Sequence, residues 1–172
     1  MLDTLGETKA PSARQLTVLW FVPLSAPLMI GVALSLLAMF AHYPPPAELL
    51  SRETLWGVSL AAMALVLLVG RRLRNLVMAP ERIAHRPLPG SAESSRDIKT
   101  QAASKVQHSM FILLGLLNFV SVLVVAACFM HADAELALLN GVYTLVLAVV
   151  TKPDFALAMR ETEAVLRRQR KV

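Results

Sequence analysis

The sequence predicts an all-α polytopic membrane protein, in which four transmembrane helices form two hairpins in a bundle. The first observation is composition: of 172 residues, 56% are apolar and only 17% are charged, whereas about a quarter of a soluble domain is charged. The second is that the apolar residues gather in four long runs without charge, and the third is that the basic residues gather between alternate runs. This composition excludes both a soluble globular domain and a disordered chain.

The four runs have lengths that match a bilayer, which requires about 20 apolar residues in a helix. The longest contain no charged residue between Arg14 and Glu48 or over 106–132. The other two are shorter, and the stems of basic residues at their ends extend them toward the headgroups. For the fourth run, a re-entrant or interfacial segment is the alternative. We predict membrane spans over residues 19–43, 54–72, 107–131 and 135–152.

The basic residues predict the orientation of these spans. Of the 17 Lys and Arg residues, all except Arg52 lie before the first span, between the second and third, or after the fourth. The positive-inside rule assigns these segments to the cytoplasm, so both termini are expected there. Rich usage of Leu, Ala and Arg suggests a bacterial inner membrane. Because topology accounts for the pI near 9.9, no nucleic-acid partner is expected.

The chain divides into a four-helix transmembrane domain, residues 1–152, and a cytoplasmic tail, residues 153–172. Ser51 is a candidate N-cap for the second span. Residues 79–95 contain Pro, Gly and Ser without any periodicity, which predicts a flexible cytoplasmic loop. The segment 96–107 is expected to extend the third helix into the cytoplasm.

Small and polar residues recur at helical spacing in every span, and they predict the faces on which the helices pack. Helices in lipid associate through close approach at small residues and through interhelical hydrogen bonds. A polar pore or substrate path built from the same residues is the alternative. The predicted packing residues are Gly31, Ser35 and Ala38 in the first span, Gly57, Ala61 and Ala64 in the second, Asn118 and Ser121 in the third, and Asn140 and Thr144 in the fourth.

Chemistry-bearing motifs are scarce in the sequence. No Asp, Glu, Lys or Arg lies in the interior of a predicted span, and no nucleophile–base arrangement, metal-ligand motif or phosphate loop is present. We therefore predict no catalytic residue and no cofactor. His42 and His131 lie at the ends of the first and third spans, and they would form a haem or metal site if they met. Interfacial histidines without a ligand are the preferred interpretation.

The tail is predicted to form an amphipathic helix with a basic end. Its apolar face recurs at steps of four, three and four residues, at Phe155, Met159, Thr162 and Leu166. We expect this face to lie on the inner leaflet, although docking on a partner subunit is the alternative. The residues expected to contact anionic headgroups are Arg167, Arg168, Arg170 and Lys171.

These features predict a non-catalytic integral membrane subunit or accessory protein that acts through helix–helix contacts in a homo-oligomer or a larger complex. The expected partners are the lipid bilayer and either another membrane protein or a second copy of the chain. Two other classes stay open at this point: a transporter or channel subunit for a small solute, and a haem-bearing redox anchor.

Overall fold

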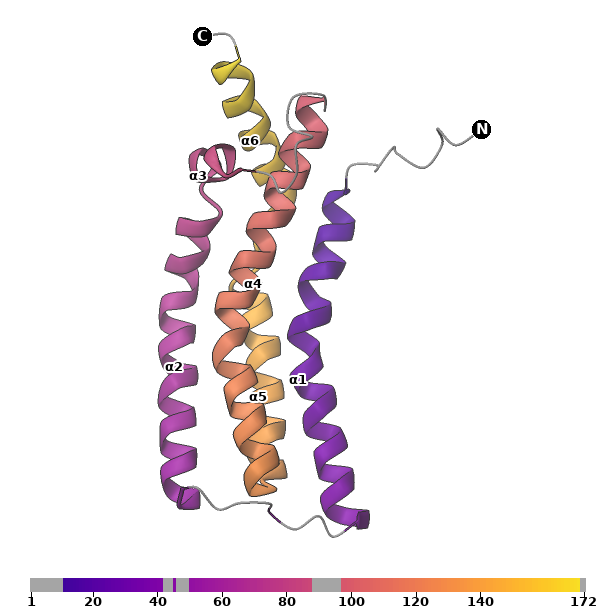
Figure 1. Cartoon of the computed structure of the whole chain (residues 1–172), viewed down its shortest axis with the longest axis vertical. Coiled ribbons are helices and arrows are strands. Elements are labelled where there is room, and N and C mark those ends of the chain that lie inside the picture. The colour runs from indigo at the N-terminus through magenta and orange to yellow at the C-terminus, as the bar shows by residue number, and fades with distance from the viewer. Residues whose placement is uncertain (1–10, 42–44, 46–49, 88–96, 171–172) are drawn as a thin grey trace, which may run out of the picture.

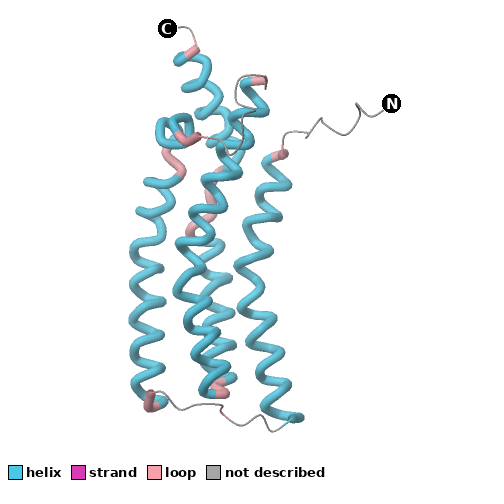
Figure 2. Tube along the Cα trace, in the orientation of Figure 1, coloured by secondary structure: helices cyan, strands magenta, loops and turns pink. Residues whose placement is uncertain are grey.

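The computed structural model describes residues 11–41, 45, 50–87 and 97–170. Within these ranges every regular element is a helix, and short loops connect the helices (Figure 2). The six helices are α1 (Ala13–Ala41), α2 (Arg52–Val77), α3 (Pro80–His85), α4 (Ile98–His131), α5 (Ala134–Val150) and α6 (Phe155–Gln169).

Four of these helices, α1, α2, α4 and α5, are long and apolar enough to cross a membrane, so the chain is a multi-pass membrane protein. Most are longer than the predicted spans, because each continues past its apolar run into polar sequence. The first begins at Ala13 and passes through Pro23 and Pro27 as one helix. The second is capped by Ser51, whose hydroxyl accepts the backbone N–H of Thr54 at 3.3 Å.

The membrane helices are arranged with α4 and α5 in the middle, α1 on one side and α2 on the other (Figure 1). The most extensive contact in the bundle joins α1 to α5, and α2 packs chiefly on α4. Within the described residues, α1 and α2 do not form a packed pair, so the first predicted hairpin is not observed. By contrast, α4 and α5 pack together and are joined by a short turn at Ala132 and Asp133.

The bundle has two distinct ends, which we name from the chain. The turn end holds the end of α1, the beginning of α2 and the connection between α4 and α5 (Figure 1). The tail end holds the beginning of α1, the end of α2, α3, the beginning of α4, and α6 (Figure 1). The polyproline connection near residues 43–46 lies outside the described residues, apart from Pro45.

The expectation of a flexible loop over residues 79–95 is wrong for its first part, where α3 forms. Pro80 occupies the first turn of this helix, a position for which its fixed φ is suited. Ile83 is fully buried, and the ammonium of Lys105 donates to the carbonyl oxygens of Ala84 and Arg86, each at 2.8 Å. These bonds satisfy carbonyls that the short helix leaves unpaired. Residues 88–95 lie outside the described residues.

The tail helix α6 packs on the protein itself. Its buried residues are Phe155, Ala158, Thr162 and Leu166, and it contacts the beginning of α4 and the short helix α3. Of the predicted apolar face, Phe155, Thr162 and Leu166 are buried and Met159 is half-buried, while Ala158 is buried as well. The expectation that this face lies on the inner leaflet or on a partner subunit was wrong, because the face packs against α3 and α4 of the same chain.

Candidate functional site

The most extensive helix contact in the bundle is the seam between α1 and α5, and at two glycines the helices approach each other closely. A Cβ atom added to Gly31 would lie 2.8 Å from the carbonyl oxygen of Ala137 and 2.9 Å from the nitrogen of Leu138. A Cβ added to Gly141 would collide with the Cα atom of Leu28. Because these neighbours include backbone atoms, the two helices touch through their main chains, as small residues permit in lipid.

The other predicted packing residues of α1 lie near this seam. Ser35 and Ala38 are half-buried, and the Ser35 hydroxyl donates to the carbonyl oxygen of Gly31 in its own helix at 2.9 Å.

Polar side chains connect α4 to α5 inside the bundle. The Asn140 amide, which is fully buried, donates to the Ser121 hydroxyl at 2.9 Å and to the Ser121 carbonyl oxygen at 3.1 Å. Thr144 is also buried, but its hydroxyl donates within α5 to the carbonyl oxygen of Gly141. Asn118 is half-buried on α4. The predicted polar residues of these two helices thus include one interhelical contact, between Asn140 and Ser121.

The predicted packing stripe of α2 does not face the bundle. Gly57, Ala61 and Ala64 are all exposed, and a Cβ added to Gly57 would meet no atom within 4 Å. The buried face of α2 instead holds Leu55, Ser59, Met63, Gly70 and Val77. At 3.6 residues per turn, the two sets lie on opposite sides of the helix. The expectation that Gly57, Ala61 and Ala64 form the inner seam of this bundle is therefore wrong, and the stripe points outward.

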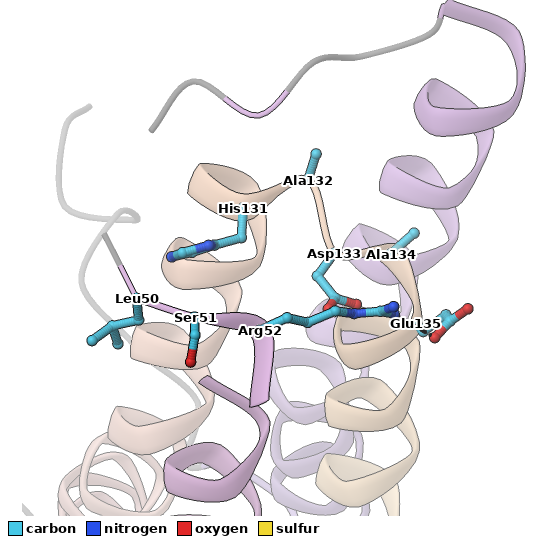
Figure 3. A pocket seen from close by; sticks show the side chains of 8 residues that line it. All are labelled: Leu50, Ser51, Arg52, His131, Ala132, Asp133, Ala134 and Glu135. Carbon is cyan, nitrogen blue, oxygen red and sulfur yellow. Dashed lines mark hydrogen bonds and ion pairs between the residues drawn. The ribbon is translucent and has the colours of Figure 1, made fainter. Parts of the chain in front are cut away.

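At the turn end, Asp133 is the centre of a cluster of polar side chains (Figure 3). Asp133 lies in the turn between α4 and α5, and its side chain is nevertheless only 4% exposed. One carboxylate oxygen accepts the backbone N–H of Leu136 at 3.0 Å and so caps α5. The other accepts the indole N–H of Trp56 at 2.8 Å and the Nε–H of Arg52 at 3.1 Å. Asp133 therefore joins the beginning of α2 to the beginning of α5.

Arg52 reaches across from α2 to both acidic residues of the turn (Figure 3). Besides Asp133 it donates to the Glu135 carboxylate at 2.7 Å, and its guanidinium lies 5.9 Å from the centre of the Trp56 ring. Glu135 is 75% exposed, so this second ion pair contributes little. The ion pair between Arg52 and Asp133 is stronger than the pair between Arg52 and Glu135. The Asp133 carboxylate is shielded from water, and a buried charge is stable only when protein groups pair with it.

These contacts set the protonation of Asp133. Burial by itself raises the pKa of a carboxyl group, but the N–H groups of Leu136 and Trp56 and the positive charge of Arg52 outweigh burial, and the pKa of Asp133 lies below its ordinary value. The group is therefore charged and fully engaged at neutral pH. Such a carboxylate acts as a clamp between helices.

The cluster borders a cavity of about 520 Å³ at the turn end, the turn-end hollow, which His131 also lines. The His131 ring points away from the Arg52–Asp133 pair (Figure 3). Its predicted companion His42 lies outside the described residues. Within the part of the chain that the structure describes, no three His, Cys, Asp or Glu side chains are grouped to hold a metal ion.

At the tail end, aromatic and basic side chains surround the junction of α5 and α6. The buried Trp20 of α1 donates its indole N–H to the carbonyl oxygen of Ala148 at 2.9 Å, and its ring meets that of Phe155 edge-on. Arg74 of α2 donates to the carbonyl oxygen of Lys152 at 3.3 Å. Arg52 binds Asp133 just before α5, and Arg74 binds the Lys152 carbonyl just after α5. Both ends of α2 are thus attached to residues that flank α5.

The predicted headgroup-contacting residues of the tail are exposed, in the part that the structure describes. Arg167, Arg168 and Arg170 are solvent-accessible on α6, while Lys171 lies outside the described residues. Arg167 pairs with Glu163 one turn earlier, at 2.6 Å.

Several contact residues escaped the sequence prediction. Gly141 lies in a stripe of small residues on α5 with Ala137, Thr144 and Ala148, at steps of four, three and four, and this spacing was a usable signal. The sequence also held a signal for the contacts of Arg52 with Asp133 and Glu135. Arg52 is the sole Lys or Arg on its side of the predicted topology, and the two acids lie in the turn between the third and fourth spans, on the same side.

Comparison with known proteins assigns no class to this fold and this site. Neither family models, nor curated proteins, nor solved structures gave a match to the chain.

Proposed function

We propose that the protein is a non-catalytic integral membrane subunit or accessory protein, which associates through α2 with a second copy or with another membrane protein. One observation carries the proposal. Gly57, Ala61 and Ala64 form an exposed small-residue stripe on a membrane-crossing helix. Within this chain, glycines on α1 and α5 bring two backbones into contact, and the stripe on α2 offers the same kind of surface to a helix from outside.

The attachment of α2 at both ends supports this use of its outer face. Arg52 and Trp56 bind Asp133 at the turn end, and Arg74 binds the Lys152 carbonyl at the tail end. These contacts limit rotation of α2 about its own axis, so the stripe stays turned outward. When a partner helix binds, α2 already holds the required orientation. Little conformational entropy is then lost on binding, which favours association.

The proposal includes a location and a topology. The excess of Lys and Arg in alternate segments supports both termini lying in the cytoplasm, and the composition supports a bacterial inner membrane. We propose that consecutive spans cross the membrane in opposite directions, and that the basic end of α6 lies near anionic headgroups. The described residues add no observation that favours a solute channel or a haem anchor.

Cysteine crosslinking in native membranes tests the association. The native Cys128 is buried, so the unchanged chain is the background. We expect Ala61→Cys to form an oxidant-dependent disulfide with a second copy, or with a cysteine of a partner that mass spectrometry identifies. The matched control is Val69→Cys, which lies 45% exposed on a different side of α2. Equal crosslinking at both positions, or none at Ala61→Cys and Ala64→Cys, would contradict the proposal.

A further inference from the structure

A second hollow lies at the tail end, between the beginning of α1 and the junction of α5 and α6. This tail-end hollow has a volume of about 460 Å³, and Arg14, Thr17, Lys152 and Asp154 line it together with Phe155. Two of these side chains are cations that come from opposite ends of the chain. The fold thus brings together charges that are 138 positions apart, as the numbers 14 and 152 show.

The two cations of the tail-end hollow have no acidic partner among the described residues. Arg14 and Lys152 are both exposed and form no ion pair there. The Lys152 ammonium lies 5.9 Å from the centre of the Phe21 ring, which turns it back toward α1. Asp154 also lines the hollow, but one of its carboxylate oxygens accepts the N–H of Leu157 and caps α6. Two positive groups against one acid leave the hollow positive.

The hollow lies at the level where membrane headgroups are expected. Arg14 is the last charge before the long uncharged run of α1, and Lys152 is the first charge after the uncharged run of α5. Further along the same stretch of α1, the side chains of Val18 and Val22 are 57% and 59% exposed, and acyl chains can cover them.

We propose that the tail-end hollow binds the phosphate of an anionic membrane phospholipid, with Arg14 and Lys152 as its two cationic contacts. Basic pockets between helices at a membrane surface bind such headgroups. Free phosphate offers the same charge, but it has no chains to cover the apolar face of α1 below the hollow. A lipid satisfies both parts of the surface at once, and we therefore commit to the lipid.

Native mass spectrometry of the full-length protein tests the site, with phosphatidylglycerol and phosphatidylcholine as competing lipids. We expect the protein to retain phosphatidylglycerol preferentially. The double variant Arg14→Gln/Lys152→Gln is expected to lower this preference roughly tenfold or more, because both surface cations are lost. Lys152→Arg, which keeps the charge, is expected to preserve it. Thermal unfolding in detergent identifies any variant that fails to fold.

The matched control is Arg71→Gln/Arg72→Gln, which removes two exposed cations at the same end of α2, away from the hollow. We expect it to leave the preference unchanged. Equal losses in the two double variants would overturn the proposal, because they would show a general basic belt. An unchanged preference in Arg14→Gln/Lys152→Gln, or no preference in the native protein, would also overturn it. Displacement of the lipid by millimolar inorganic phosphate would reject the commitment to lipid.

Discussion

Replacing Gly31 by Ala adds a single methyl group where the backbones of α1 and α5 lie in close contact. The new Cβ would lie 2.8 Å from the Ala137 carbonyl oxygen and 2.9 Å from its carbon, so α1 must move away from α5. Overpacking of this kind costs about 1–3 kcal/mol. Gly57→Ala is the matched control, since its Cβ meets nothing within 4 Å. Both changes share the gain in helix propensity, up to about 1 kcal/mol, so their difference isolates the overpacking.

The measurement is the free energy of unfolding in mixed detergent micelles, followed by far-UV circular dichroism as SDS is added. We expect Gly31→Ala to be less stable than Gly57→Ala by about 1–3 kcal/mol. Gly141→Ala, whose Cβ would collide with the Leu28 backbone, is expected to follow Gly31→Ala. If Gly31→Ala and Gly57→Ala unfold at the same SDS fraction, the main-chain contact between α1 and α5 does not contribute to stability, and the reasoning fails.

Three further predictions concern the turn end and the topology. Asp133→Ala is expected to cost about 2 kcal/mol, because a helix cap and a buried ion pair are lost, whereas Glu135→Ala, at an exposed position, is expected to be nearly neutral in the same titration. Because the pKa of Asp133 is lowered in the folded protein, its contribution to stability is complete above the unfolded pKa of about 3.9 and is lost as the pH falls through the lower folded value. If the native protein and Asp133→Ala lose stability equally on acidification, the proposed role of Asp133 is refuted. Ala132 has a left-handed backbone with φ 53°, so Ala132→Gly is expected to raise the unfolding free energy by about 0.5–1 kcal/mol, and a decrease would contradict this account of the turn. A reporter inserted at Pro45 is expected to be active only in a periplasmic format and one at the C terminus only in a cytoplasmic format; the reverse pattern would reject the proposed topology.

The number and position of the membrane helices could be predicted because they depend on local sequence. Charge-free runs of bilayer length occur four times, and all four become long helices. The helix cap at Ser51 is equally local, and it forms as expected. The helix α3 was missed because its six residues are stabilised from a distance, by the Lys105 ammonium and the burial of Ile83. No local periodicity reports such contacts.

The direction in which each helix faces could be predicted only in part. On α1, Gly31 is one of the predicted packing residues, and a Cβ added there would lie within 3 Å of the backbone of α5. On α2, the same kind of stripe points away from the bundle. A stripe of small residues shows that a close approach is possible, but it does not say whether the approaching helix belongs to the same chain. The amphipathic pattern of α6 is ambiguous in the same way. It indicates that one face is buried, but it does not say against what, and in the structure that face packs on α3 and α4.

The rotation of α2 is held by its buried face and also by polar contacts at both ends, which hydropathy does not record. Arg52 and Trp56 both reach Asp133, and one of the Arg74 nitrogens reaches the chain just after α5. Two attachments so far apart on one helix limit its rotation, and the face opposite to them is then left for lipid or for a partner. Gly57, Ala61 and Ala64 lie on the exposed side of α2, so the polar contacts at its ends help to keep these residues turned toward the surrounding membrane, where the proposed partner would bind. Arg52, the first residue of α2, thus bears on the proposed function, because its contact with Asp133 helps to orient the helix that would bind the partner.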